Sequence, residues 1–202
     1  MLQPPLVWPS VATPHAEREA VKDLYAHLTA LKYNIEAWDA GLQLYKLALK
    51  APAQVRRDIA LRWRFVAANE CVFQLHNLKK RIEKIRGVKV KKCPSLSTLI
   101  DTRHLRQSAK LLNDYFPKIN ELRDAIAHAG EFDAHPEDHA SDGVFALKGF
   151  REGHTFSAPF KKKLYHLDIT DETLNRMIEV AETFFEGFVL TAQALEAEGH
   201  LE

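Results

Sequence analysis

Apolar residues recur at spacings of three and four along several long segments, which predicts amphipathic helices. The clearest stripe covers residues 21–49, and Pro52 should stop that helix. Its positions are Val21, Leu24, Leu28, Leu31, Ile35, Trp38, Leu42, Tyr45 and Leu49. Thr13 and Pro14 fit an N-cap followed by a first helical residue. Gly41 lies off the stripe and should cost about 1 kcal/mol relative to alanine.

Two further helical regions follow, over about residues 53–86 and 97–128. The core face of the first is expected to hold Leu61, Phe65, Ala68, Val72, Leu75, Ile82 and Ile85, widened by Trp63, Val66 and Phe73. Gly87 should end that helix. The second region keeps its apolar spacing through Pro117, which should kink the helix or split it in two.

The pattern then changes to one typical of strands. Residues 143–150 and 154–169 flank the turn residues Arg151-Glu152-Gly153, which predicts a β-hairpin. Pro159 should confine the second strand to a sheet edge or interrupt it. Residues 161–163, three lysines, are interpreted as protection of an edge strand.

The last helix should begin at Thr170, a suitable N-cap, and its apolar spacing continues over residues 174–195. Four amphipathic regions of this kind predict an all-α fold. We expect an antiparallel four-helix bundle with a β-hairpin, at about residues 143–169, inserted between the third and fourth helices.

Composition agrees with a soluble globular protein: of 202 residues, 46% are hydrophobic and 27% are charged. We interpret residues 1–13 as an N-terminal arm and 14–200 as a single helical-bundle domain, and leave out Leu201-Glu202 as typical of a cloning scar. The N-terminal segment does not resemble a signal peptide, and no apolar run is long enough to span a membrane.

The two cysteines, Cys71 and Cys93, lack the spacing of metal or redox motifs. Free cysteines are typical of a reducing compartment, so we expect a cytoplasmic protein with no membrane partner.

Charge is distributed unevenly, although the net charge is only +1. Residues 50–110 hold 16 Lys+Arg against 4 Asp+Glu, whereas residues 111–202 hold 8 against 18. A basic segment attracts phosphate backbones, and the candidate RNA contacts are Lys79, Lys80, Lys84, Lys91 and Lys92. Alternatively, these lysines form a solvated helix end, and basic and acidic helices lie side by side.

The end of the third helical region carries the candidate chemistry, in the stretch ELRDAIAHAGEF at residues 121–132. Leu122 and Ile126 fit the core, but Arg123 and His128 do not. Five residues along a helix turn through about 500°, so these two side chains lie about 140° apart and could flank a cleft. A histidine suits general acid–base catalysis, and an arginine suits phosphate binding. Together they could cleave RNA without a metal, with the ribose 2′-hydroxyl as nucleophile.

The segment RDAIAH, with Arg123, Asp124 and His128, resembles the motif of the HEPN superfamily, which is Arg-x4–6-His with a polar residue after the arginine. HEPN domains are small helical bundles. Many are metal-independent ribonucleases of toxin–antitoxin, phage-defence or RNA-processing systems, and they dimerise so that two motifs share one cleft.

The resemblance implies a metal-independent endoribonuclease that acts as a homodimer, with RNA as substrate and an antitoxin or regulatory protein as a further partner. Arg123 would contact the phosphate, His128 would transfer protons, and Asp124 would orient one of them. Some toxin members carry a tyrosine two residues after the histidine, where this chain has Gly130, so it does not resemble that subgroup.

Two alternatives remain beside this hypothesis. Some HEPN members have lost activity, so the chain could be a non-catalytic module that binds a protein, a nucleotide or RNA. In the second, Arg123 pairs with Glu121, Asp124 or a carboxylate of another helix, and His128 simply caps the helix end.

A second group of polar residues, His128, His135, Glu137, Asp138 and His139, has the residue types of a zinc or nickel site. Its spacing matches no metal motif, so we expect a solvated loop and no metal. No cofactor is expected either, because the chain lacks a glycine-rich phosphate loop and a Ser or Cys nucleophile motif, and its aromatic residues fit core positions.

Overall fold

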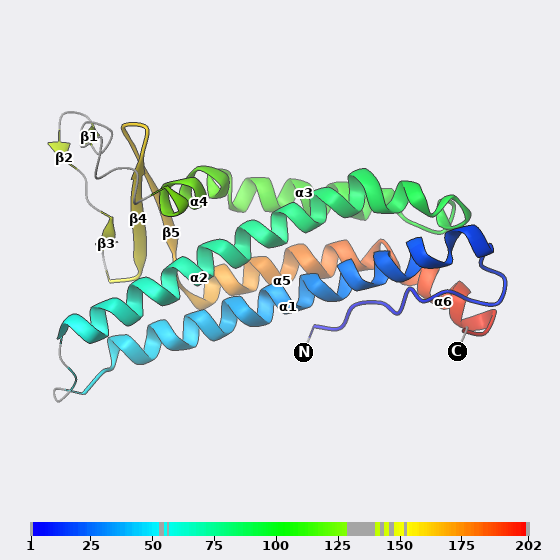
Figure 1. Cartoon of the computed structure of the whole chain (residues 1–202), viewed down its shortest axis with the longest axis horizontal. Helices are drawn as coiled ribbons and strands as arrows, with labels where there is room; N and C mark the ends of the chain where they lie inside the picture. The colour runs from blue at the N-terminus through cyan, green and yellow to red at the C-terminus, as the bar shows by residue number, and fades with distance from the viewer. Residues whose placement is uncertain are drawn as a thin grey trace. The chain divides into compact units, whose positions relative to one another are not determined.

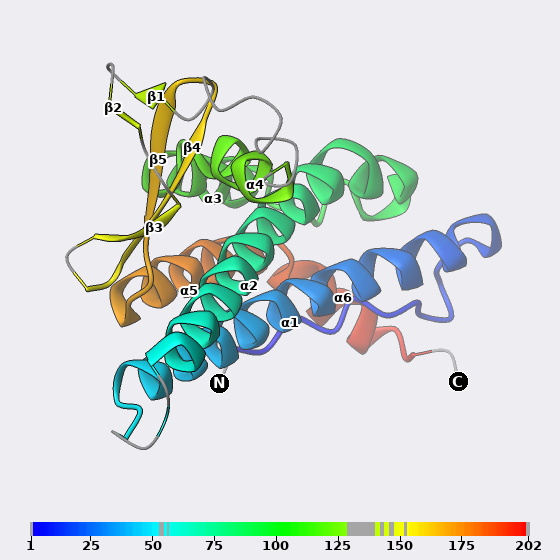
Figure 2. The same cartoon turned by 60° about the vertical axis from the view of Figure 1, so that its left-hand side comes forward.

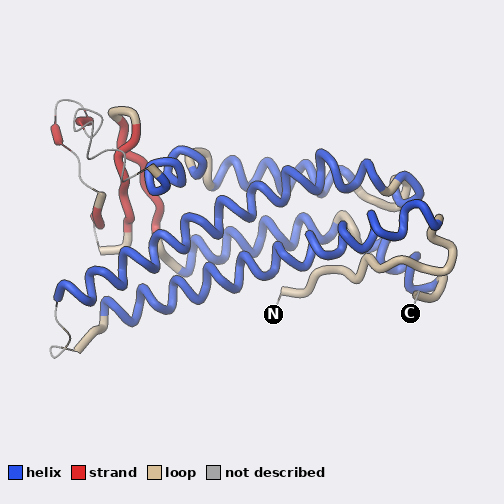
Figure 3. Tube along the Cα trace, in the orientation of Figure 1, coloured by secondary structure: helices blue, strands red, loops and turns tan. Residues whose placement is uncertain are grey.

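The computed structural model of the chain describes residues 2–52, 55, 57–128, 140–141, 144–145, 148–151 and 153–200. It is mostly helical, with a small antiparallel sheet between α4 and α5 in the chain (Figures 1 and 3). The helices are α1 (Arg18–Leu49), α2 (Arg57–Lys84), α3 (Thr102–Tyr115), α4 (Ile119–Ala127), α5 (Asp171–Glu186) and α6 (Val189–Ala197). The strands are β1 (Ala140–Ser141), β2 (Val144–Phe145), β3 (Gly149–Arg151), β4 (Thr155–Phe160) and β5 (Lys163–Asp168).

The chain divides into two compact units. Unit 1 comprises Met1–Ile35, Asn77–Tyr115 and Arg176–Glu202, and unit 2 comprises Glu36–His76 and Phe116–Asn175. The apolar stripe of the first predicted helix is buried from Val21 to Tyr45, as expected, whereas Leu49 is 39% exposed.

Unit 1 is built around apolar side chains from all of its helical segments. The fully buried ones include Val21, Leu24, Leu28, Leu31, Leu78, Ile82, Met177, Phe184 and Phe188. The N-terminal arm packs on this core, since Trp8 meets the ring of Tyr25 edge-on. The arm also meets the chain's other end, because the backbone N–H of Val11 donates to the carbonyl oxygen of Gly199 (3.0 Å).

Several predicted helices end at other residues than expected. Pro117 does split the third region, into α3 and α4. Gly87 does not end the second helix, because the backbone continues through a π-helical segment, Ile85–Lys89. The last region is broken between α5 and α6 at Gly187, where a Cβ atom would lie 2.8 Å from Leu105 Cδ2 and 3.0 Å from the carbonyl oxygen of Asp101. The break at Gly187 depends on contacts with Asp101 and Leu105, which local periodicity does not report.

Unit 2 contains the three-stranded antiparallel sheet β3-β4-β5, and α4 lies beside β4 and β5 (Figure 2). Phe150 pairs with Phe156, and Phe156 pairs with Leu167. The predicted second strand is therefore two strands, β4 and β5. Pro159 pairs with Leu164 and lies beyond the end of β3, so among the described residues no second strand requires its missing N–H.

An arginine on α2 attaches the β3–β4 turn to the helices of unit 2. The Arg64 guanidinium lies 4.2 Å from the centre of the Phe150 ring and donates to the carbonyl oxygen of Gly153 (3.0 Å). The Tyr45 hydroxyl donates to the same carbonyl. Cation–π and hydrogen-bond contacts thus converge on a turn that the sequence correctly predicted.

Two of the three lysines at 161–163 have a different role from the predicted one, whereas Lys163 lies in β5, an outer strand of the three-stranded sheet. Lys161 and Lys162 are the two central residues of the β4–β5 turn, with φ angles of 47° and 63°. Positive φ at both positions matches the right-handed twist of the two strands, but it is unfavourable for residues other than glycine, asparagine and aspartate.

Replacing Lys162 by glycine should therefore raise the free energy of unfolding by about 1 kcal/mol, because glycine adopts this backbone conformation without a Cβ clash. Chemical denaturation measures the change. The matched control is Lys163→Gly, which lies in β5 and should destabilise the protein. A Lys162→Gly variant no more stable than the parent would contradict the strain argument.

The face of α2 that was predicted to widen the core is partly exposed. Trp63 and Val66 are 42% and 59% exposed, and Leu61, predicted on the core face itself, is 44% exposed, so the assignment of all three to the core is wrong. Ile59, one turn before Trp63, is 37% exposed. A stripe can be placed on one face of a helix from sequence, but its width depends on how many neighbouring segments pack against it.

Both cysteines are free and buried. Burial raises the pKa of Cys71 to about 12 and that of Cys93 to about 11. No helix in the described part of the chain is both long and apolar enough to cross a membrane.

Candidate functional site

The Arg-x4-His motif lies on α4, the nine-residue helix that follows Pro117. Its apolar face is buried and holds Leu122, Ala125 and Ile126. Arg123 and Asp124 fall between these positions and are partly exposed, with 37% and 41% of their side chains accessible. Because successive helix residues point in different directions, Arg123 and Asp124 lie at the surface of unit 2 while Leu122 and Ile126 lie in its core.

Arg123 is held by its neighbour. Its Nη1 atom donates to Asp124 Oδ1 (3.0 Å), a contact that both the orienting role and the structural alternative predict for Asp124. Its Nε atom is buried and has no hydrogen-bond partner among the described residues. The Nη1 donor of the guanidinium is thus satisfied by Asp124, whereas the buried Nε donor has no acceptor among the described residues. Buried donors in native proteins are nearly always paired with a protein group or with water.

His128 lies at the end of the helix, as the sequence predicted. It is the C-cap residue, with φ −97° and ψ 10°, and its backbone N–H donates to the carbonyl oxygen of Asp124 (3.0 Å). Its side chain is half-buried. Gly130, predicted as the left-handed residue that ends the helix, lies outside the described residues.

The five candidate RNA-contacting lysines belong to unit 1, whereas α4 belongs to unit 2. Lys84, Lys91 and Lys92 are exposed. Lys80 is also exposed and forms an ion pair with Glu83 (3.0 Å). Lys79 is only 7% exposed, which removes it from the exposed basic set because a buried lysine cannot follow a nucleic-acid backbone at the surface.

Of the candidate metal group, the described residues include only His128. Residues 135 and 137–139 lie outside the described part of the chain. Within the described part, no group of three His, Cys, Asp or Glu side chains is arranged to hold a metal ion.

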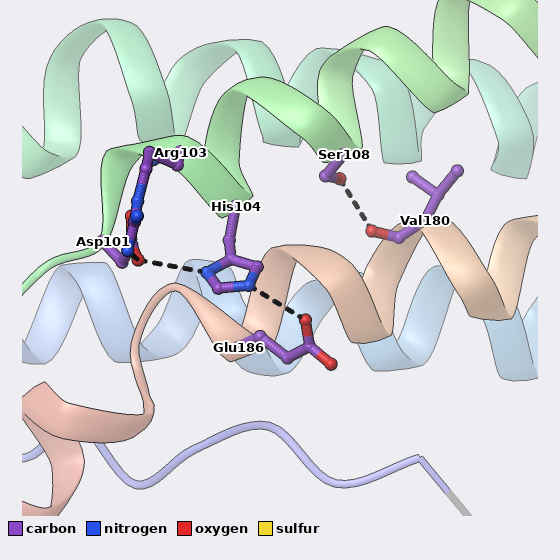
Figure 4. Close-up of polar contacts among 6 residues, drawn as sticks. All are labelled: Asp101, Arg103, His104, Ser108, Val180 and Glu186. Carbon is purple, nitrogen blue, oxygen red and sulfur yellow. Dashed lines mark hydrogen bonds and ion pairs between the residues drawn. The ribbon is translucent and has the colours of Figure 1, made fainter.

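A polar cluster in unit 1 was missed at the sequence level (Figure 4). Asp101 caps α3, since its Oδ1 atom accepts from the backbone N–H of Arg103 (2.9 Å). His104 lies between two carboxylates, with Nδ1 3.4 Å from Asp101 Oδ2 and Nε2 3.3 Å from Glu186 Oε2. The hydrogen bond from the Arg103 side chain holds the pKa of Asp101 well below its ordinary value.

The cluster joins the start of α3 to the end of α5, and a hydrogen bond from Ser108 Oγ to the carbonyl oxygen of Val180 (2.7 Å) joins the same two helices further along (Figure 4). We interpret it as a structural contact, because the acidic groups on both sides of His104 are themselves at helix ends. Aspartate directly before a helix is a recognisable N-cap signal, and it would have moved the predicted start from residue 97 to residue 102.

Comparison with models of known protein families, with curated proteins and with solved structures finds no match for this chain.

Proposed function

We propose that the protein is a HEPN-like, metal-independent endoribonuclease in which Arg123 and His128 carry the chemistry. The observation that supports this most directly is the end of α4, where a partly exposed arginine and a C-cap histidine flank a buried apolar face. The fold proposed with it is the antiparallel four-helix bundle with a hairpin insertion. The buried stripe of α1 and the position of the strands between α4 and α5 support that fold.

The reaction needs one proton removed and one proton supplied. The ribose 2′-oxygen attacks the phosphorus, the bond from phosphorus to the 5′-oxygen breaks, and a 2′,3′-cyclic phosphate and a 5′-hydroxyl remain. A base takes the 2′-hydroxyl proton and an acid gives a proton to the leaving 5′-oxygen. Arg123 stabilises the extra negative charge on the phosphate oxygens, for which its guanidinium is suited.

A homodimer supplies both proton-transferring groups, because His128 of one chain acts as the base and His128 of the other as the acid. The exposed stripe of α2, formed by Ile59, Trp63 and Val66, supports self-association, since apolar side chains at spacings of four and three make a helix-pairing face. Trp63 is the residue type most often found at the energetic centre of an interface.

Charges on α2 complement this stripe. In an antiparallel pair of α2 helices related by a two-fold axis at Val66, Arg62 lies opposite Glu70 of the second copy, and the same contact occurs twice. Arg62 and Glu70 are both exposed, and Arg62 has no ion-pair partner among the described residues. The proposed interface is therefore self-complementary in charge.

The ribonuclease proposal is tested by cleavage of single-stranded RNA in the presence of a chelator. The parent should release products with 2′,3′-cyclic phosphate ends, and Arg123→Ala and His128→Ala should each lower the rate by about 10²- to 10⁴-fold. Lys118→Ala, an exposed cation at the other end of α4, serves as the control and should cleave like the parent. Equal cleavage by the parent and both motif variants would refute the assignment.

The dimer is tested by a charge exchange at α2. Arg62→Glu should weaken dimerisation and cleavage together, because two like-charged pairs then face each other. The double variant Arg62→Glu/Glu70→Arg should restore both, as measured by sedimentation and by the cleavage rate. A double variant no better than the single one would exclude this pairing.

The non-catalytic alternative has one observation in its favour, the hydrogen bond between Arg123 and Asp124, which occupies part of the guanidinium. A module of this kind would bind a protein, a nucleotide or RNA and release no cleavage products. It predicts a measurable affinity for its ligand that Arg123→Ala weakens while the RNA stays intact.

A further inference from the structure

Unit 1 contains a pocket of about 410 Å³ between the end of α2 and the start of α3. The π-helical segment Ile85–Lys89 contributes Arg86 and Gly87 to its wall, and α3 contributes Thr102, Leu105 and Arg106. The volume is within the range of small-molecule sites.

Two guanidinium groups in this pocket are not used by the fold. Arg86 is half-buried and Arg106 is exposed, and neither has a hydrogen-bond or ion-pair partner among the described residues. Neighbouring arginines are engaged, since Arg81 donates to Asn34 Oδ1 (2.9 Å) and Arg103 donates to Asp101 Oδ2 (2.7 Å). The pocket therefore holds two arginines that have no partner in the part of the chain that the structure describes.

The other groups in the pocket leave room for an anion. Its one carboxylate, Glu83, is paired with Lys80, so its charge is already offset. Leu105 is buried and, with Val90, supplies an apolar part of the lining. At Gly87 a Cβ atom would meet nothing within 4 Å, so a ligand can approach the backbone there.

We propose that this pocket binds the phosphate group of a nucleotide-sized ligand, with Arg86 and Arg106 on the phosphate oxygens and the apolar lining against the remainder of the molecule. Guanidinium groups match phosphate oxygens with paired donors, and Thr102 adds a hydroxyl donor. The site does not involve α4, so it is independent of the ribonuclease proposal.

The test is calorimetric titration of the full-length protein with adenosine monophosphate, with inorganic phosphate and with a short single-stranded RNA that lacks terminal phosphates. Arg86→Ala and Arg106→Ala should each weaken phosphate-dependent binding by about 10-fold, the loss expected for one charge-assisted hydrogen bond. Binding of the monophosphate but not of the RNA identifies a free nucleotide as the source of the phosphate. Binding of the RNA but not of the monophosphate identifies a phosphodiester.

Two controls separate the pocket from general basic charge. Lys110→Ala removes an exposed cation of α3 outside the pocket and should bind like the parent. Gly87→Leu should keep the fold, because its Cβ is not obstructed, and should fill the pocket and reduce binding. The proposal is overturned if none of the three probes binds, or if binding is unchanged in both arginine variants.

Discussion

Replacing Gly187 by alanine is expected to lower the free energy of unfolding by about 2–3 kcal/mol, because the added methyl group overpacks a closed contact. The new Cβ would lie 3.0 Å from the backbone carbonyl oxygen of Asp101 and 2.8 Å from Leu105 Cδ2. The leucine can rotate, but the carbonyl cannot move without breaking the hydrogen bond from Asp101 N–H to the Gly187 carbonyl oxygen (2.9 Å). Urea denaturation measures the loss.

The matched control is Gly87→Ala, whose Cβ meets nothing within 4 Å. It should be neutral or stabilise the protein by up to about 1 kcal/mol through helix propensity. The Gly187 variant should also bind phosphate less well, since Leu105 and Arg106 follow the start of α3 and line the proposed pocket. Equal free energies of unfolding for the two glycine variants would show that the close contact at Gly187 does not oppose an added methyl group.

Gly41→Ala should destabilise the protein by about 1–3 kcal/mol, although alanine is the better helix former. Gly41 lies within α1, where an added Cβ would be 2.9 Å from Cys71 Sγ and 3.4 Å from the carbonyl oxygen of Ala67, both on α2. From sequence alone this glycine was predicted only to weaken the helix. The structure instead shows it as the point of close approach between α1 and α2 within unit 2.

The prediction for Gly41 has an internal test, because the obstructing atom can be removed. In the Cys71→Ala background, the Gly41→Ala change should cost nothing or become slightly stabilising, so the coupling between the two positions is about 1–3 kcal/mol. Thermal and denaturant unfolding of the four proteins in this cycle measure it. Costs of Gly41→Ala that are the same in both backgrounds would show that the Cys71 sulfur is not the obstacle.

Much of the candidate site follows from local sequence. Leu122 and Ile126 indicate which face of α4 is buried, and Arg123 and Asp124 follow as partly exposed residues. The position of His128 at the helix end was also predicted. The partner of Arg123 was left open among Glu121, Asp124 and other helices, because a guanidinium on a flexible side chain can reach several carboxylates.

Other parts needed contacts between distant segments. The sequence places Lys79 in a basic run and predicts an exposed cation, yet Lys79 is buried. Its exposure depends on which segments pack against α2, and the local sequence does not specify them. Arg86 and Arg106 are 20 positions apart in sequence, and nothing in their local patterns joins them in one pocket. The N-cap at Asp101, in contrast, has a local signal, because an aspartate stands directly before the helix.

By itself, the sequence determined the helical stripes, the split at Pro117, the N-cap at Thr170, the turn near Gly153 and the position of the Arg-x4-His motif. Each of these depends on backbone propensity or on the period of a helix, which are properties of a few neighbouring residues. The tertiary structure alone decided the exposure of Trp63, the break at Gly187, the Lys161-Lys162 turn and the pocket that joins Arg86 to Arg106. These features depend on which segments come into contact in the folded chain, and local sequence patterns do not specify contacts between distant segments.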